Sequence, residues 1–525
     1  MSPKRVQIKR ALVSVSDKRD LVPFIRGLRE MGIQVISTGG TAKLLQEGGI
    51  PVQEISDFTG FPEILAGRVK TLHPKVHGGI LAKRHDKGHL EQVKRLGLQL
   101  IDLVIVNLYP FEETTRRKGV KLHELIEQID IGGVALIRSA AKNFESVGVI
   151  SCPAQYPAVL EELRRQGGCL SEETRLELAV AAFSETSYYD SVICQGLSRR
   201  AKGELQWPDH LVLAVSRRQI LRYGENPHQR GSWYQWPSAA SGSNGCGNLK
   251  QLHGKELSFN NLLDLSAALE VAAAFEKPAA TVIKHTNPCG VASAPTLAKA
   301  FERAFAGDSL SAFGGIVGLN RAVDKAAAKA IIGAGFLECV VAPGYSAEAL
   351  DILKTKKNLR LIEAPLSSAR PSSGCLDIKQ VANGLLVQQP DRIVVKPSQW
   401  RIVTRVKPTA AQRRDLAFAW TVSRFVRSNA IVLVKNEQVV GVGAGQMSRV
   451  DSVKIALKKA GTRSKGAVLA SDGFFPKPDG PQFAVKAGVK AIVQPGGSVQ
   501  DPEVVKVAEK AGVPMLFTGE RHFRH

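Results

Sequence analysis

The sequence has few aromatic residues and no long apolar run. Aromatics make up 6% of the 525 residues, so the stacking platforms on which single-stranded nucleic acids bind are scarce. No segment approaches the roughly 18 consecutive apolar residues of a membrane span. Met1–Arg5 leads directly into a predicted strand and lacks the apolar core of a signal peptide. We therefore expect a cytoplasmic protein without membrane or nucleic-acid partners.

Closely spaced cysteine pairs are also missing. The seven cysteines are an odd number and lie scattered through the chain without a CxxC pair. Zinc ribbons and disulfide frameworks need paired cysteines, so both are disfavoured. The pattern indicates reduced thiols, as in the cytosol.

Positive charge, in contrast, is in excess. The chain has 71 Lys and Arg against 48 Asp and Glu, a net charge of +23. This excess indicates anionic partners such as phosphorylated metabolites, carboxylate-rich cofactors or nucleic acid. The basic residues are scattered rather than gathered in runs, which weighs against nucleic acid. The length suits roughly three to four units of 150 residues, or two larger domains.

The first region alternates predicted strands and helices. Strands are predicted at 10–17, 34–38, 103–106 and 147–150. With the helices between them, this order favours a parallel sheet covered by helices. A helical run at 170–197 closes the region, and 198–209 is predicted to be a linker because it contains Gly203 and Pro208. We place the domain boundary near residue 200.

The stretch STGGT at 37–41 is a candidate phosphate cradle. Its glycines let backbone N–H groups approach an anion, its hydroxyls add donors, and the next helix offers its N-terminus. It matches neither the P-loop nor GxGxxG. A plain connection between strand and helix is the alternative.

A basic stretch at 67–79 follows and contains two histidines. Four histidines of this region have spacings that suggest metal ligands on a helix: His73, His77, His85 and His89. Pro74, Gly78 and Gly79 are predicted to break such a helix, which argues against a metal site. A cationic rim that receives an anionic substrate is the favoured interpretation.

Polar groups recur at the ends of predicted strands. Asn107 and Tyr109 follow the strand at 103–106, and Asp130 and Lys142 flank an apolar helix. Each alone fits a helix cap or a surface pair. Their recurrence at strand ends favours one shared site.

The second region contains a β-branched run at 281–283 that ends in Lys284 and His285 and is predicted to break at the following Asn-Pro and Gly. In α/β enzymes, ligands sit beyond the carboxyl ends of strands, and His has the side-chain pKa nearest neutrality. A solvated strand end is the alternative.

A similar succession occurs later in this region. A predicted hairpin at 429–442 is followed by a glycine turn with a helix to about residue 460 and by a strand and turn at 468–476. The recurrence hints at a diverged internal duplication. The Ser/Gly-rich stretch 236–247 is predicted to be a mobile loop.

Together the motifs resemble one family, the bifunctional purine-biosynthesis proteins that join aminoimidazole-carboxamide ribonucleotide (AICAR) transformylase to inosine monophosphate (IMP) cyclohydrolase. The motifs are SVSDK (14–18), STGGT (37–41), GRVKTLHP (67–74), NLYPF (107–111), DIGG (130–133), LRYGENPHQ (221–229), KHTNPCG (284–290), SNA (428–430), GAGQMSR (443–449) and SDGFFP (471–476). A series in this order is far more specific than any single member.

The resemblance implies an α/β protein with a methylglyoxal-synthase-like (Rossmann-like) parallel-sheet domain at 1–200, the IMP cyclohydrolase. It implies an AICAR transformylase domain of two deaminase-like α/β subdomains at 201–525. The expected reactions are formyl transfer from 10-formyltetrahydrofolate to AICAR and dehydrative closure of formyl-AICAR to IMP. No metal is implied for catalysis, and a structural monovalent cation stays open. The family is homodimeric, with transformylase sites across the subunit interface.

For formyl transfer, His285 is suited as general base because the aromatic amine of AICAR is a poor nucleophile. Lys284 is suited to stabilise the oxyanion or to protonate the folate leaving group. By resemblance, Asn429 orients His285 and the substrate. The resemblance assigns further substrate-binding positions to Arg222, Tyr223, Phe313, Gly314, Glu338, Arg449, Phe474, Asp479, Arg521 and His525. Glu338 stands where the family often has Asp, and the C-terminal tail, which alone reads as flexible, becomes part of the site.

For ring closure, the attack is intramolecular, so orientation supplies much of the rate. The resemblance gives Lys70 the neutralisation of developing oxygen charge. Tyr109, Asp130 and Lys142 would relay protons, with acid and base not distinguished. The substrate-binding positions of this half are Ser14, Lys18, Ser37, Gly39, Gly40, Thr41, Arg68, Thr71 and Asn107.

Three rival interpretations remain. A zinc nucleobase deaminase is disfavoured because Ala292 stands where PCxxC needs its second cysteine and no HxE precedes Cys289. A basic nucleic-acid-binding protein would show strongly salt-dependent binding. The N-terminal region alone would be a sensor of a phosphorylated ligand, although its retained candidate catalytic residues favour catalysis.

Overall fold

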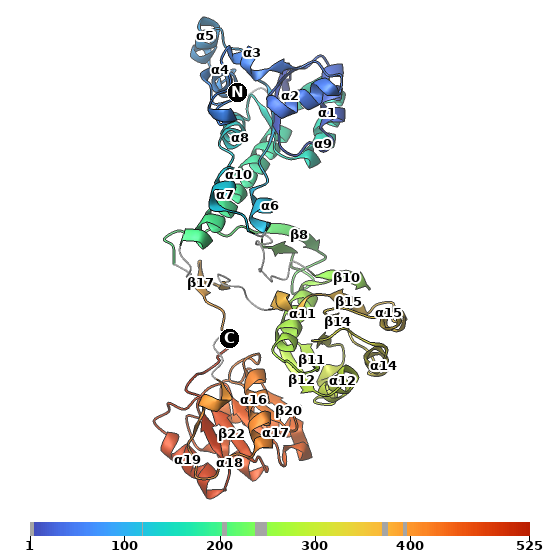
Figure 1. Cartoon of the computed structure of the whole chain (residues 1–525), viewed down its shortest axis with the longest axis vertical. Helices are drawn as coiled ribbons and strands as arrows, with labels where there is room; N and C mark the ends of the chain where they lie inside the picture. Colours follow the sequence, from blue (N-terminus) through green and yellow to red (C-terminus); the bar gives the residue numbers. More distant parts are fainter. Residues whose placement is uncertain (1–4, 118, 202–206, 237–248, 370–375, 392–395) are drawn as a thin grey trace. The chain divides into compact units, whose positions relative to one another are not determined.

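The computed structural model describes residues 5–117, 119–201, 207–236, 249–369, 376–391 and 396–525 (Figure 1). The chain forms two compact units, residues 1–215 with 237–241 and residues 216–236 with 242–525. A functional boundary at residue 200 stays a prediction, and the loop predicted at 236–247 lies almost entirely outside the described residues. None of the helices in these ranges is long and apolar enough to span a membrane.

The first unit is built on a five-stranded sheet in the order β4-β3-β2-β5-β6. All of its neighbouring strands pair in parallel, which confirms the predicted parallel sheet. Its strands are β2 (Arg10–Val15), β3 (Gln34–Ser37), β4 (Gln53–Glu54), β5 (Leu103–Asn107) and β6 (Gly148–Ile150). Every residue of β5 is buried, as expected for a strand inside a sheet covered on both faces.

Helices alternate with these strands. They are α1 (Leu21–Glu30), α2 (Gly39–Glu47), α3 (Ile55–Thr59), α4 (Pro74–Leu81), α5 (Lys87–Arg95), α6 (Phe111–Arg116), α7 (Leu122–Ile126), α8 (Gly132–Lys142), α9 (Tyr156–Arg165) and α10 (Glu172–Ala201). Strand β1 (Arg5–Gln7) pairs antiparallel with β7 (Cys169–Ser171). Because α10 continues to Ala201, the linker predicted from residue 198 begins too early.

No continuous helix carries the four histidines, since α4 ends at Leu81 and α5 begins at Lys87, but the break is not at 74–79, because α4 runs through these residues. Pro74 is the first helical residue, where its missing N–H is not needed, and His73 caps the helix by accepting from Lys75 N. Gly79 is required by packing, since a Cβ there would lie 2.4 Å from Gln99 O. The glycines thus allow close contact rather than ending the helix.

The second unit contains two six-stranded sheets with the same strand order. The first half has β10 (Lys250–His253), β11 (Ala279–Lys284), β12 (Asn287–Ser293), β13 (Ile316–Leu319), β14 (Cys339–Ala342) and β15 (Arg360–Glu363), in the order β10-β15-β14-β13-β11-β12. The second half has β18 (Arg401–Ile402), β19 (Ile431–Val434), β20 (Val439–Gly443), β21 (Val468–Ser471), β22 (Ala491–Gln494) and β23 (Met515–Phe517), in the order β18-β23-β22-β21-β19-β20. This equality confirms the two similar subdomains.

The pairing is also the same in both halves. The central hairpins β11–β12 and β19–β20 are antiparallel, and the last strands β13–β14–β15 and β21–β22–β23 are parallel. The helices are α11 (Phe259–Ala273), α12 (Leu297–Phe305), α13 (Ser309–Ala312), α14 (Lys325–Gly333) and α15 (Ala347–Lys354), then α16 (Ala410–Ser423), α17 (Arg449–Ala460), α18 (Asp479–Lys486) and α19 (Asp501–Lys510). One hydrophobic core contains Leu265 of α11, Leu416 of α16 and residues of both sheets. Two further hairpins are β8 (Ser216–Leu221) with β9 (Gly231–Gln235) and β16 (Asp377–Val381) with β17 (Gly384–Gln388).

Candidate active sites

The first candidate site lies where α2 begins, at the carboxyl end of β3. Lys18 Nζ donates to Gly40 O at 3.2 Å. Lys70 Nζ lies 3.5 Å from where a Cβ on Gly39 would be. Two ammonium groups therefore flank the N-terminus of α2, where the backbone N–H groups and the helix dipole favour an anion.

The hydroxyls near this helix have different environments. Ser14 Oγ lies 3.0 Å from Thr38 Oγ1 at the helix N-cap. The hydroxyls of Ser37 and Thr41 are buried and donate to backbone carbonyls of β2 at 3.0 and 3.1 Å. Ser37 thus links β3 to β2, and Thr41 links α2 to β2. Their contact with a ligand stays a prediction.

The basic residues before α4 are paired with carboxylates. Lys70 Nζ lies 2.8 Å from Glu63 Oε1, and Arg68 donates to Glu127. The sequence motifs do not point to either acidic partner. The resemblance assigns the ammonium group of Lys70 to the substrate. Because Glu63 already contacts this group, a bound anion has to share or replace the contact.

Three predicted residues meet at the start of α8. Asp130 Oδ1 accepts from Gly133 N at 2.7 Å, and Asp130 N donates to the hydroxyl of Tyr189 at 2.9 Å. Burial raises the pKa of Asp130, although backbone hydrogen bonds from Gly133 and Tyr109 oppose the shift. Thr71 Oγ1 lies 3.0 Å from where a Cβ on the first residue of α8 would be. Tyr109, Asp130 and Thr71 therefore form one group.

Lys142 and Asn107 lie elsewhere. Lys142 is the last residue of α8, about 15 Å along the helix axis from its start, so one chain does not bring it to Asp130.

Asn107 is buried at the end of β5. Its side-chain oxygen accepts from two backbone N–H groups after β2, both at 2.7 Å, which fixes the loop that carries Lys18.

The histidines of this unit have separate partners. His77 Nδ1 lies 3.0 Å from Ser139 Oγ, and burial lowers the pKa of His77. His85 faces Glu145 at 3.9 Å. Within the described ranges, no three or more His, Cys, Asp and Glu residues gather as metal ligands.

The second candidate site is built on the hairpin β11–β12. Lys284 ends β11, and His285 and Thr286 form the turn with φ of 52° and 60°. The predicted break at Asn-Pro-Gly is wrong, because Asn287 already opens β12. The turn comes two residues earlier and places His285 at its first position.

The turn is held from both sides. Asp264, on α11, accepts from His285 N at 3.2 Å and from Thr286 N at 2.6 Å. Lys284 Nζ donates to Phe313 O at 2.8 Å. The ring of Phe313 packs against Phe336 with centroids 5.4 Å apart. Lys284 therefore contacts Phe313, and the role of Lys284, His285 and Phe313 in one site stays a prediction.

Gly314 and Glu338 border this group. Gly314 has a φ of 71° and donates to Phe336 O at 2.9 Å. Glu338 Oε2 lies 2.6 Å from Arg360 Nη1. The carboxylate at the position where the family often has Asp is thus paired within the chain.

A buried polar cluster lies at the start of β19. Asn429 Oδ1 accepts from Arg449 Nη2 at 2.7 Å, and its Nδ2 donates to Gln446 O at 2.8 Å. Arg449 Nη1 donates to Asp472 Oδ1 at 2.5 Å, and Asp472 is fully buried. Asp472 is a functional candidate that sequence reasoning missed, although it stands inside the SDGFFP motif.

The C-terminal tail is fixed to this cluster rather than flexible. Ser428 N donates to Arg524 O at 2.9 Å, and Arg524 N donates to Ser428 Oγ at 3.1 Å. The Arg521 guanidinium lies 4.5 Å from the centre of the Phe523 ring, which contacts the His525 ring. The tail therefore carries its cations to the same end of the second sheet.

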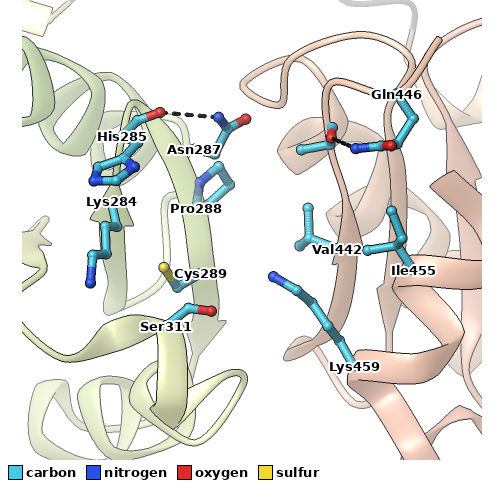
Figure 2. A pocket seen from close by; sticks show the side chains of 11 residues that line it. Lys284, His285, Asn287, Pro288, Cys289, Ser311, Val442, Gln446, Ile455 and Lys459 are labelled. Carbon is cyan, nitrogen blue, oxygen red and sulfur yellow. Dashed lines mark hydrogen bonds between the residues drawn. The ribbon is translucent and has the colours of Figure 1, made fainter.

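A cavity of about 420 Å³ lies between the two halves of the second unit (Figure 2). Its walls include Lys284, His285, Cys289 and Ser311 from the first half and Gln446, Ile455 and Lys459 from the second. Burial raises the pKa of Cys289 to about 11, which keeps the thiol neutral. Asn429 donates a hydrogen bond to the backbone carbonyl of Gln446, one of the lining residues.

The other predicted residues are placed as follows. Arg222 and Tyr223 follow β8, and Arg222 Nη2 donates to the Tyr223 hydroxyl at 2.9 Å. Phe474 is partly exposed beyond β21. Asp479 opens α18, and its Oδ1 accepts from Gly480 N. Their contact with substrate stays a prediction.

The parallel-sheet unit and the duplicated mixed-sheet unit define a two-part α/β enzyme with a candidate site in each part. An MGS-like domain model matches residues 20–135, and a model described as the AICARFT/IMPCHase bienzyme matches residues 140–459. The chain therefore belongs to the AICARFT/IMPCHase bienzyme family. It joins an AICAR formyltransferase to an IMP cyclohydrolase.

Two relatives illustrate the match. The bifunctional purine biosynthesis protein PurH of Bacillus subtilis (strain 168) is 49% identical over 99% of this chain and 100% of its own length. PurH of Cyanothece sp. (strain PCC 7425 / ATCC 29141) is 51% identical over 98% of this chain and 99% of its own. Among solved structures, ForH is 38% identical, with a TM-score of 0.34 over 37% of this chain and 99% of that chain.

Proposed function

We propose that the second unit transfers the formyl group of 10-formyltetrahydrofolate to AICAR with His285 as general base. The turn that carries His285 supports this role. Both turn residues have a positive φ, a conformation for which Asn-Gly is preferred and a β-branched residue is unfavourable. Such a departure from local preference is typical of a functional site.

The transfer needs one proton removed and one supplied. The AICAR amine nitrogen attacks the formyl carbon while His285 accepts its proton, and the bond from that carbon to folate N10 then breaks. Lys284 stabilises the oxyanion or protonates the leaving nitrogen. Lys284 Nζ donates to the backbone carbonyl of Phe313, so its ammonium group is held next to Phe313.

Substrate recognition involves the second half and the tail. Asn429 and Arg449 form one hydrogen-bonded group, which is suited to orient AICAR and bind its phosphate or carboxamide oxygens. Arg222, Arg521 and His525 add cationic groups, and Asp479 is the partner proposed for the pterin donors. These assignments rest on the motifs together with the placement described above.

The first unit closes formyl-AICAR to IMP with loss of water. Lys18 and the N-terminus of α2 bind the phosphate, and Lys70 neutralises charge on the reacting oxygen. Asp130 and Tyr109 relay protons, and the raised pKa of Asp130 suits a group that has to exchange a proton near neutrality. Lys142 lies too far along α8 to join this group in the same chain.

The active form is a homodimer of the cytoplasm. Support for a dimer comes from exposed apolar side chains on α10, namely Leu176, Val180 and Phe183, because clustered exposed apolar groups mark interfaces. Support for the cytoplasm comes from the five described cysteines, all free thiols. Sedimentation of the pure protein tests the dimer.

The decisive experiment supplies AICAR and 10-formyltetrahydrofolate to the pure protein and follows formyl-AICAR and IMP. The wild type makes IMP, His285→Ala makes neither product but still cyclises added formyl-AICAR, and Lys70→Ala accumulates formyl-AICAR. Normal formyl transfer by His285→Ala would refute its role as base. Normal IMP formation by Lys70→Ala would refute the cyclisation site.

A further inference from the structure

The two central hairpins of the second unit have the same turn. His285 and Thr286 have φ of 52° and 60°, and Asn436 and Glu437 have φ of 55° and 54°. Both hairpins also carry an irregular register next to the turn, after Val282 in β11 and after Leu433 in β19. The duplication therefore preserves the turn in detail.

Each turn is held by one carboxylate from the preceding helix. Asp264, on α11, accepts from His285 N at 3.2 Å and from Thr286 N at 2.6 Å. Asp415, on α16, accepts from Asn436 N and Glu437 N, both at 2.7 Å. The carboxylate thus satisfies both N–H groups of a turn whose residues are in the left-handed region.

The surroundings of the two turns also correspond. The lysine before each turn donates to a carbonyl, Lys284 to Phe313 O at 2.8 Å and Lys435 to Lys465 O at 2.9 Å. Each accepting residue precedes the strand after the hairpin, β13 or β21, by three positions. The frame is therefore the same, while the first turn carries a histidine and the second an asparagine.

The two turns differ in how much they depend on their carboxylate. Asn436 tolerates a positive φ because its short polar side chain bonds locally. Histidine is also found at positive φ, but Thr286 is β-branched, and for a β-branched residue a positive φ is a genuine outlier, whereas its counterpart Glu437 is unbranched. The first turn therefore needs Asp264 more than the second needs Asp415.

We propose that Asp264 is a positioning residue for formyl transfer. It fixes the left-handed backbone of His285 and so the direction of the imidazole ring, and it does not itself touch the substrate. This inference rests on the proposed role of His285 as general base. A small error in the direction of a base is costly, because proton transfer requires hydrogen-bond geometry.

The test uses Asp264→Asn, which keeps the shape and removes the charge. One amide oxygen then faces two N–H groups, and the turn loses one acceptor. We expect kcat for formyl transfer to fall about 10- to 100-fold, with the KM for AICAR little changed. Cyclisation of added formyl-AICAR by the same chain stays at the wild-type rate and shows that the first unit is folded, while the unchanged KM for AICAR shows that the second unit is folded.

Asp415→Asn is the matched control because it places the same lesion in the other turn. It is expected to lower the melting temperature, although less than Asp264→Asn does, while formyl transfer keeps its wild-type kcat. Equal losses of kcat in both variants would overturn the proposal, since Asp264 would then act only through the stability of the unit.

A rescue variant separates positioning from direct chemistry. Glycine accepts a positive φ without help, so Thr286→Gly in the Asp264→Asn background restores the turn and most of the lost kcat. Failure of this rescue, relative to Thr286→Gly alone, would overturn the proposal in favour of a direct role for the carboxylate. If His285→Ala keeps formyl transfer, the proposed base itself is wrong, which the Asp264 variants cannot mimic.

Discussion

Asp130 shows how burial affects both chemistry and stability. Burial raises the pKa of Asp130 above its ordinary value of 3.8. At a pH between the ordinary pKa and the raised pKa, the folded state therefore binds more protons than the unfolded state. Stability therefore falls as the pH rises through this window. Asp130→Asn removes the titrating group, so the variant gains stability relative to the wild type between about pH 4 and pH 7.

Urea unfolding of both proteins at the two pH values measures this gain, and loss of formyl-AICAR cyclisation measures the cost to function. Asp17 is the control. Its pKa is lowered, mainly by the side-chain hydrogen bond from Arg19, so its contribution is lost only as the pH falls below 3.8. Asp17→Asn therefore leaves the pH 4 to pH 7 difference unchanged. If the stability of Asp130→Asn changed between pH 4 and pH 7 by the same amount as that of the wild type, the prediction would be contradicted.

The duplication also supplies a reference for the buried ion pair of Arg449 with Asp472. In the first half, Asn320 accepts from Ala279 N at 2.8 Å, as Asp472 accepts from Ala430 N at 3.0 Å. Leu297 opens α12 as Arg449 opens α17. The same frame thus folds with a neutral pair, which suggests that the charges serve the site rather than stability.

We expect Asp472→Ala to lose about 3–5 kcal/mol of stability, because it leaves a buried guanidinium unpaired. The double variant Arg449→Leu with Asp472→Asn rebuilds the neutral pair and recovers most of that loss. It does not recover formylation of AICAR. Thermal unfolding and the formylation assay measure the two effects. A double variant as unstable as Asp472→Ala would show that the charges are structural.

Individual residues differed in how far the sequence could predict them. Lys284 and His285 stand next to each other in a motif, so their proximity is local. Asp264 accepts from the backbone of His285, 21 residues further along the chain. Glu63 pairs with Lys70 in a loop whose conformation no motif encodes. Such partners depend on tertiary packing, which one sequence does not display.

At the scale of elements, the hairpins and helices of the second unit cross so closely that glycine is required. A Cβ on Gly290, in β12, would lie 1.9 Å from Ala304 O of α12, and one on Gly441, in β20, would lie 2.2 Å from Ala456 O of α17. Both contacts are with backbone atoms, which cannot move aside without shifting a helix. Gly333, at the end of α14, meets nothing within 4 Å.

We therefore expect Gly290→Ala to destabilise the second unit by about 1–3 kcal/mol or more through overpacking. Gly333→Ala, the matched change on a helix, is expected to stabilise by about 0.5–1 kcal/mol because glycine is a poor helix former. Denaturant unfolding measures both. Equal effects of the two substitutions would refute close crossing as the reason for Gly290.

Elements with one clear periodicity were predictable, and elements governed by contacts were not. The buried apolar strands β2 and β5 follow from their sequence, because parallel strands covered on both faces are continuous apolar runs. Helix α4 was missed since Pro74 and Gly79 are unfavourable in isolation. Its position is decided by an N-terminal proline and by contact with Gln99.

At the scale of the whole chain, the proposed function assigns one of two consecutive reactions to each compact unit. On this proposed assignment the product of the second unit is the substrate of the first, and the charge of +23 favours capture of an anionic intermediate by a long-range field. The sequence indicated this division through its ordered motifs. How fast the intermediate passes from one site to the other is a property of the assembled protein that motifs do not encode.

The last prediction tests whether the two sites work independently. A mixture of His285→Ala, which lacks formyl transfer, and Lys70→Ala, which lacks cyclisation, contains one intact site of each kind on different chains. We expect the mixture to convert AICAR to IMP, because formyl-AICAR released by one chain can bind another. IMP should appear after a lag that shortens as the concentration of His285→Ala is raised. Each variant alone is the control and makes no IMP from AICAR. A mixture that accumulates formyl-AICAR without IMP would show that cyclisation requires an intact second unit in the same chain.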